Sequence, residues 1–219
     1  MSQNRKLNVL AIGAHYDDIE LGCAGSLRKY VTQGHNVYMI VVTKSNYTNH
    51  DGTPYRTEEQ ADREGKNAAK IIGVKELRCL DVETKHVKYG PELIESLNSI
   101  IDELNIDIIF THWQYDVHQD HSAIGKATLN AGRHSPRILM YRSNWYQTTE
   151  SFRDNFYIEM TDYVDIKKES LIAHEVEFAR RGMKWVDFVL HKNKNSGLEI
   201  GVEYAEAFEC VKWLDINYD

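Results

Sequence analysis

The chain has 219 residues, 42% of them hydrophobic and 27% charged, and its formal net charge at pH 7 is −7. This composition excludes disordered and collagen-like chains, and the length suits one globular domain. The sequence has no long block of Lys or Arg that could contact the phosphates of a nucleic acid, which argues against a nucleic-acid partner. Three widely spaced cysteines make no disulfide framework, and no stretch has the ~20 apolar residues of a membrane helix. We therefore expect a cytoplasmic protein that does not insert into membranes.

Strands and helices are expected to alternate through the first two thirds of the chain. An apolar run at 9–14 predicts a buried strand, and a helical period follows from Ile19. Further strands are expected at 37–43, 76–81, 107–111 and 137–141, and further helices at about 58–72, 91–104 and 122–132. Residues 44–57 are expected to form a long polar loop, 156–160 an extra strand, and about 166–181 or further one long helix.

This alternation predicts an α/β fold with a mostly parallel, doubly wound sheet and helices on both faces. We expect one domain over 1–219, with the core at about 7–142 and a small C-terminal extension at about 143–219. In such a sheet, ligands bind at the carboxyl ends of the strands.

Two clusters of polar residues stand at predicted strand ends. The first strand is followed by His15, Asp17 and Asp18, and the fourth by His112, Asp116, His118, Asp120 and His121. Because the carboxyl ends of parallel strands share one edge, we expect the clusters to meet. Imidazoles and carboxylates suit Zn²⁺, and either cluster alone is a weaker signal because an aspartate there can simply cap a helix. Together the clusters predict a metal site.

The spacing indicates which residues could bind the ion. His15 and Asp18 lie three residues apart across a strand-to-helix turn and can converge on one ion. His121 would complete a His-Asp-His set, with the fourth position open for water. The set favours Zn²⁺, although Fe²⁺ and Co²⁺ also accept it.

The neighbouring residues suit amide hydrolysis. Asp17 would accept a proton from the activated water. His118, when protonated, would stabilise the oxyanion and protonate the leaving nitrogen, and Asp120 would hold His118 in orientation. The two clusters therefore predict metal-assisted hydrolysis of an amide.

The stretch from His15 to Glu20, together with His118-Gln-Asp-His121, resembles the PIG-L/LmbE-like N-deacetylases. The resemblance extends through Gly25-Ser26, Thr43 and the stretches 68–73 and 204–208. It implies a Rossmann-like fold, a zinc ion, and removal of an acetyl group from an N-acetylglucosamine-type amino sugar or sugar conjugate. Relatives often assemble as trimers or hexamers, and the oligomeric state of this chain, a homo-oligomer of that kind or not, stays open.

The resemblance implies the same residue roles. The matching positions are His15, Asp18 and His121 as zinc ligands, Asp17 as base, His118 as electrophile or acid, and Asp120 as the residue that tunes it. Arg56 matches an arginine that contacts substrate, and Asp116 is assigned to the substrate as well. Tyr16 and Gln119 stand where the family usually has proline, and Tyr16 could offer its ring or hydroxyl to the substrate.

Alternatives remain at this point. A nucleotide-binding Rossmann module would need a glycine-rich turn after the first strand, but the chain has Gly13-Ala-His-Tyr there. A metal-binding protein without catalysis would not need Asp17 or His118, and another amide or acyl substrate is also compatible. Free amino sugars, sugar nucleotides, thiol-linked sugars and antibiotic intermediates all stay open as substrates.

Overall fold

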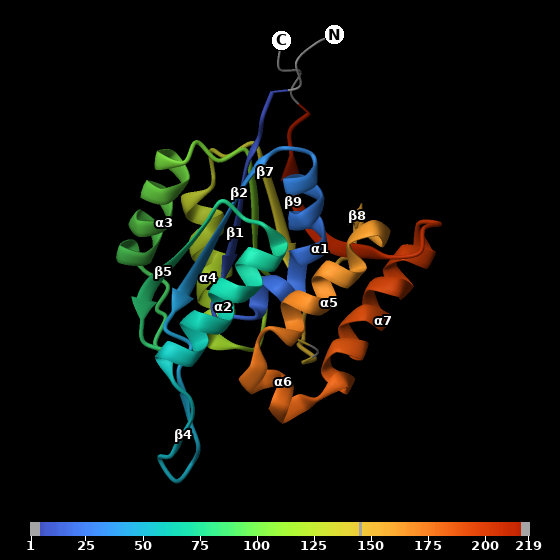
Figure 1. Cartoon of the computed structure of the whole chain (residues 1–219). Helices are drawn as coiled ribbons and strands as arrows, with labels where there is room; N and C mark the ends of the chain where they lie inside the picture. The colour runs from blue at the N-terminus through green and yellow to red at the C-terminus, as the bar shows by residue number, and fades with distance from the viewer. Residues whose placement is uncertain (1–4, 145, 216–219) are drawn as a thin grey trace.

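The computed structural model describes residues 5–144 and 146–215. Its main sheet has the strand order β5-β2-β1-β6-β7-β9-β8 (Figure 1). The strands are β1 (Asn8–Gly13), β2 (Asn36–Thr43), β5 (Glu76–Val82), β6 (Ile108–His112), β7 (Arg137–Tyr141), β8 (Phe156–Glu159) and β9 (Ala205–Trp213). The five strands from β5 to β7 run parallel, and the β7–β9 and β9–β8 pairs are antiparallel. The predicted mostly parallel sheet is therefore confirmed.

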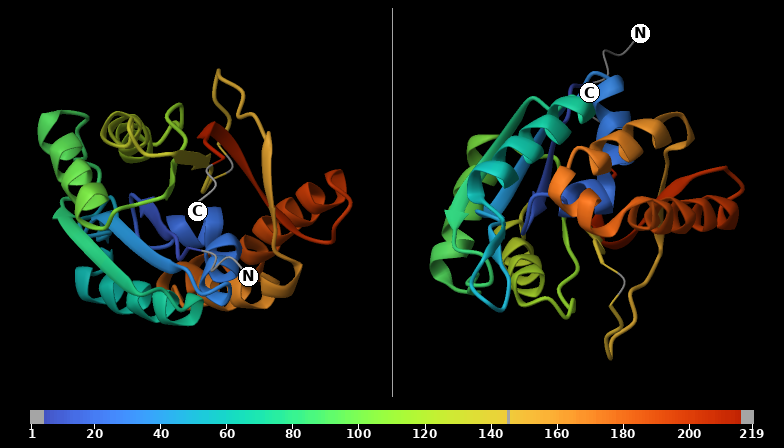
Figure 2. Two further views of the ribbon diagram at one scale, coloured as in Figure 1. Left: turned by 90° about the horizontal axis from the view of Figure 1, so that it is seen from above. Right: turned by 60° about the horizontal axis from the view of Figure 1, so that its bottom comes forward.

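Helices cover both faces of the sheet (Figures 1 and 2). One face packs against α1 (Asp18–Thr32) and α2 (Glu58–Ile72), and the other against α3 (Pro91–Glu103) and α4 (Gln119–Ala131). Along β1, Val9 and Ala11 face the first core, whereas Leu10 and Ile12 face the second. The continuous apolar run of this strand follows from burial on both sides.

The order of the strands determines where a ligand can bind. β1 lies between β2 and β6. The strands of this sheet that directly follow β1 in the chain lie on one side of it, and the later strands from β6 onward lie on the other side. In doubly wound sheets this switch point opens a crevice at the carboxyl ends of the strands. β1 ends at Gly13 and β6 at His112, so both polar clusters lie at this crevice.

The prediction of a long polar loop at 44–57 was wrong in one respect, because this segment contains a short hairpin. Strands β3 (Tyr47–Thr48) and β4 (Pro54–Arg56) pair antiparallel. The turn between them contains Gly52 with φ of 82°, and the Asp51 carboxylate accepts hydrogen bonds from Thr53. Figure 1 shows the hairpin projecting at the same end of the molecule as α6.

The single long helix predicted from about residue 166 was also wrong. The structure has a 3₁₀ turn at Thr161–Tyr163 and then three helices, α5 (Val164–Ile172), α6 (Glu175–Arg181) and α7 (Met183–Glu199). His174 leaves helical geometry between α5 and α6, with its side chain fully buried. Gly182 lies between α6 and α7 and has a φ of 67°. Glycine adopts this positive φ readily because it has no Cβ. No helix within 5–144 or 146–215 is long and apolar enough to span a membrane.

Candidate active site

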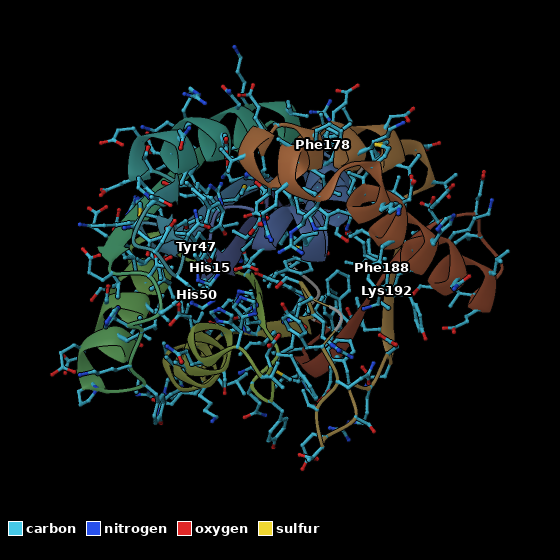
Figure 3. All side chains as sticks on the ribbon, turned by 90° about the horizontal axis from the view of Figure 1, so that it is seen from below. His15, Tyr47, His50, Phe178, Phe188 and Lys192 are labelled. Atoms are coloured by element: carbon cyan, nitrogen blue, oxygen red, sulfur yellow. The ribbon has the colours of Figure 1, made fainter. Side chains whose placement is uncertain are left out.

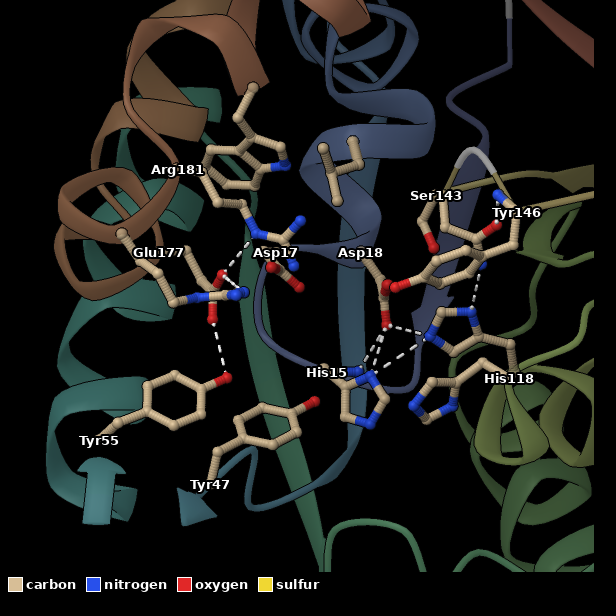
Figure 4. A pocket seen from close by; sticks show the side chains of 15 residues that line it. His15, Asp17, Asp18, Tyr47, Tyr55, His118, Ser143, Tyr146, Glu177 and Arg181 are labelled. Atoms are coloured by element: carbon tan, nitrogen blue, oxygen red, sulfur yellow. Dashed lines mark hydrogen bonds and ion pairs between the residues drawn. The ribbon is translucent and has the colours of Figure 1, made fainter. Parts of the chain in front are cut away.

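Three potential metal-ligand atoms from the two clusters lie close together, and Figure 4 shows two of the side chains, His15 and Asp18, pointing toward one another. His15 Nδ1 lies 3.2 Å from Asp18 Oδ2, and His121 Nε2 lies 3.3 Å from each of these atoms. A tetrahedral zinc site with bonds of about 2.0–2.1 Å has ligand–ligand edges of about 3.3–3.4 Å. The donor triangle therefore fits an ion of this size.

The second ring nitrogen of each histidine in the triangle contacts a carboxylate. His15 Nε2 lies 3.1 Å from Asp120, and His121 Nδ1 lies 3.2 Å from Asp116. This arrangement is typical of metal-binding histidines, because it directs the remaining lone pair at the ion. Burial alone would lower the pKa of His121, but Asp18 and Asp116 raise it to about 10. The two carboxylates thus stabilise positive charge at this point.

These contacts refine two predictions. The Asp120 carboxylate contacts His15 and accepts hydrogen bonds from backbone N–H groups of Lys85 and Val87, whereas Asp120 acts on His118 through its backbone N–H and through its charge. Asp116 does not reach into the cavity, because it accepts hydrogen bonds from His118 N and from Asn144 Nδ2. Both carboxylates position histidines and have little free surface for a substrate.

His112 belongs to the cluster without completing the triangle. Asp18, His112 and His121 form one group of potential metal ligands, and His15, His118 and His121 form another. However, His112 Nε2 accepts the Ala14 backbone N–H at 2.9 Å. Its ring stacks on that of His121 with centroids 4.0 Å apart. We interpret His112 as packing that supports His121.

His118 lies at the start of α4, where its Nδ1 accepts the backbone N–H of Asp120 at 3.3 Å. The ring proton then stands on Nε2. Burial and the neighbouring His121 and His15 lower the pKa of His118 to about 4. This lowered pKa favours a neutral ring that donates from Nε2 beside the triangle, whereas a protonated His118 stays a prediction.

Asp17 occupies a strained position next to the triangle. It has φ of 129°, a value that costs a non-glycine residue about 1–3 kcal/mol. Its carboxylate makes no helix-capping hydrogen bond and lines the cavity. Burial and the adjacent Asp18 raise the pKa of Asp17 to about 7. The turn therefore presents a carboxylate that is not used for capping.

Arg56 and Tyr16 do not face the cavity, which corrects both substrate-contact predictions. Arg56 is 1% exposed and donates to the Tyr16 carbonyl at 3.0 Å and to Glu64 at 3.0 Å. The Tyr16 ring packs so closely on Gly65 that a Cβ there would lie 2.0 Å away, and its hydroxyl donates to Asp62. Arg56 thus holds the peptide that precedes Asp17.

The opposite wall of the cavity was not predicted from the sequence. The cavity has a volume of about 190 Å³. The lining residues outside the two clusters are Leu21, Tyr47, Tyr55, Ser143, Asn144, Tyr146, Glu177, Arg180, Arg181 and Trp185. Glu177 accepts hydrogen bonds from Tyr55, Arg180 and Arg181 (Figure 4). Most of these residues come from the hairpin and the C-terminal helices, and no local motif marks them.

Comparisons with known proteins agree with this geometry. The family model "PIG-L: GlcNAc-PI de-N-acetylase" matches residues 10–132. The "Uncharacterized deacetylase YaiS" of Escherichia coli (strain K12) is 34% identical over 168 residues, which cover 71% of this chain and 88% of that protein. The "Probable N-acetyl-alpha-D-glucosaminyl L-malate deacetylase 2" of Bacillus anthracis is 27% identical over 222 residues, 95% of this chain and 92% of that protein.

The fold is also shared with a solved structure. The N,N′-diacetylchitobiose deacetylase from Pyrococcus horikoshii superposes with a TM-score of 0.81 at 21% identity, and the match covers 93% of this chain and 83% of that one. The family model spans more than half of the chain and includes both polar clusters. The chain therefore belongs to the PIG-L family of deacetylases.

Proposed function

We propose that this protein is a zinc-dependent hydrolase that removes an N-acetyl group from an N-acetylglucosamine-type amino sugar or sugar conjugate. The observation that carries the proposal is the His-Asp-His donor triangle with the Asp17 carboxylate beside it. Membership in the PIG-L family supports it, as do relatives named for deacetylation of a glucosaminyl malate and of diacetylchitobiose.

The proposal assigns the metal to three residues. His15, Asp18 and His121 would hold the ion, and two histidines with one carboxylate suit Zn²⁺ and also accept Fe²⁺ or Co²⁺. When bound, the ion would supply Lewis-acid chemistry, lowering the pKa of water and polarising the amide carbonyl.

The protein's own residues account for the proton transfers. Asp17 accepts a proton from the attacking water on its free carboxylate. His118 donates its Nε2–H to the carbonyl oxygen as negative charge develops there. The proton held by Asp17 then passes to the departing nitrogen, and the C–N bond breaks to leave acetate and a free amine. Asp116 and Asp120 keep His121 and His15 in orientation throughout.

The direct test is acetate release from a panel of N-acetylated sugars and conjugates, with metal analysis of the same sample. We expect acetate from at least one N-acetylglucosamine derivative, loss of activity with a chelator, and recovery with Zn²⁺, Fe²⁺ or Co²⁺. Metal at one equivalent without acetate from any substrate would contradict the proposal. It would favour instead a metal-binding protein without catalysis or a hydrolase of another amide or acyl bond.

A further inference from the structure

A second, smaller cavity adjoins the metal-side cavity. Leu21, Ser143 and Asn144 belong to the walls of both, so the two cavities lie side by side. The smaller one lies between α7 and the segment that follows β7, and its volume is about 30 Å³. This is room for about two water-sized groups, enough for one small substituent and too little for a second sugar ring.

The smaller cavity is positively charged. Arg142 and Lys192 line it, and none of the described residues that line it is acidic. Lys192 lies over the Phe152 ring at 5.9 Å, and among the described residues no hydrogen bond or ion pair reaches its ammonium group. The charge of Asp154 acts on both cations. Glu199 and Glu209 act on Asp154 in turn, but neither lines the cavity, so the charged groups of its described lining are both cations.

The cavity also contains polar atoms without partners. Ser143 Oγ and Asn193 Oδ1 are buried, and neither has a hydrogen-bond partner among the described residues. Their side chains belong to residues that are only 8% and 6% exposed. An unsatisfied buried polar group costs about 1–3 kcal/mol, so a ligand that bonded to these atoms would recover that energy.

The position of the cavity relates it to the reaction site. In the view of Figure 3, Phe188 and Lys192 lie on one side of the centre of the molecule and His15 and Tyr47 on the other. Phe188 is 44% exposed and adds an apolar side to the cavity. A substrate whose acetamide lies at the donor triangle could therefore extend one substituent past Ser143 towards Lys192.

Building on the proposed function, we propose that this cavity binds an anionic group, a carboxylate or a phosphate, that the substrate carries next to its N-acetylated sugar. Lys192 and Arg142 neutralise the anion, and Ser143 Oγ donates a hydrogen bond to it. Asn193 bonds to a neighbouring hydroxyl or to the anion itself, depending on its amide orientation. The substrate class is thereby narrowed from any N-acetylated sugar to an anionic conjugate with a small charged substituent.

The test compares three N-acetylglucosamine glycosides that carry a methyl group, a phosphate or a carboxymethyl group. We expect kcat/KM for at least one anionic compound to exceed that for the methyl glycoside by about 10-fold or more, the range of a charge-assisted hydrogen bond. Whichever anion is preferred identifies the group. Equal kcat/KM values for all three would overturn the proposal.

A matched pair of variants on α7 makes the test specific. Lys192→Met keeps the length of the side chain and removes its charge, so the anionic-to-methyl ratio of kcat/KM should fall towards one. Lys194→Met is the control, because Lys194 is exposed and lies over the Tyr204 ring away from the cavity. This ratio is insensitive to partial misfolding, and an unchanged ratio in Lys192→Met would refute the assignment.

A binding experiment separates this inference from the proposed function. Zinc-loaded wild type and Lys192→Met are titrated calorimetrically with inorganic phosphate and with glycolate. About 10-fold weaker binding to the variant is expected, and this result would support the cavity even if no glycoside released acetate. Equal binding to both proteins would place the anion elsewhere and overturn the inference.

Discussion

The wall of the cavity that carries the donor triangle differs in burial from the wall that faces it. His15, Asp18 and His121 are 3–4% exposed, and each imidazole is fixed by a carboxylate on its other nitrogen. On the facing wall, Glu177 and Trp185 are as deeply buried as the triangle, but the outer part, which we call the exposed wall, includes Tyr146 at 49% exposed and the Arg180 side chain at 47%. The buried wall is preorganised for chemistry, whereas the exposed wall can adjust to a substrate.

This difference predicts separate consequences for the two walls. Changes on the buried wall should alter metal content, turnover or folding, because its groups have no water to replace a lost partner. Changes on the exposed wall should alter KM by smaller factors, because water compensates in part. The following variants test the contrast.

The largest effect is expected for His121→Ala. Removing one of three ligands should abolish metal binding, and acetate release should fall to background, because the site is lost before any chemistry occurs. Metal content by atomic spectroscopy and kcat measure the two effects. His134→Ala, an exposed histidine outside the site, is the control and should keep both. Full metal occupancy with normal turnover in His121→Ala would show that the ligand assignment is wrong.

Asp17→Asn should retain zinc while kcat falls by about 10²–10⁴, the usual contribution of a positioned base. The amide keeps the size of the side chain and cannot accept the proton. Asp18→Asn is the matched comparison on the neighbouring residue and should lose metal first. If Asp17→Asn loses zinc and Asp18→Asn keeps it, the two carboxylates have exchanged roles.

Arg56→Gln should lower the free energy of unfolding by about 3–5 kcal/mol, because it leaves the buried Glu64 carboxylate without its partner. Denaturant unfolding measures this loss. Arg63→Gln, on the exposed face of α2, should change the same free energy by no more than about 0.5 kcal/mol. A stable Arg56→Gln variant with a raised KM would restore the substrate-contact role predicted from the sequence.

Asp116→Asn should weaken metal affinity by about 10–100-fold, because the amide holds the His121 imidazole less firmly than the carboxylate does. Competition with a chelator measures the affinity. Asp102→Asn, an exposed residue of α3, should leave the affinity unchanged. If Asp116→Asn raises only KM, the residue acts on the substrate as first predicted.

The metal-side wall could be predicted because its parts are encoded locally. His15 and Asp18 flank one strand-to-helix turn, and His121 lies in the first turn of the helix after β6. The shared edge of parallel strands then brings them together. Arg56 was misassigned because its partners, the Tyr16 carbonyl and Glu64, lie 40 and 8 residues away and leave no periodic signal.

Prediction of the fold from the sequence had the same limit, because only locally encoded features could be recognised. Helices and strands that bury one regular face were predicted with nearly correct bounds, as at α2, where Gly73 ends the helix with φ of 86°. The break between α5 and α6 was missed because no glycine or proline marks it, and it lies at His174, whose side chain is fully buried. The exposed wall is therefore the part of the site that required the structure.

The smallest effect is expected for Tyr55→Phe, on the exposed wall. The variant removes the hydroxyl that donates to Glu177 at 3.2 Å and keeps the ring, which stacks on Tyr47 with centroids 5.5 Å apart. Glu177 retains its bonds to Arg180 and Arg181, so the wall should loosen without collapsing. A single neutral hydrogen bond is worth about 0.5–1.5 kcal/mol, so KM should rise by about 2–10-fold with kcat and metal content unchanged. Tyr89→Phe, on an exposed tyrosine outside the cavity, should change none of these quantities. A fall in kcat larger than the change in KM would mean that this hydroxyl acts in the transition state, and the contrast between the two walls would then be lost.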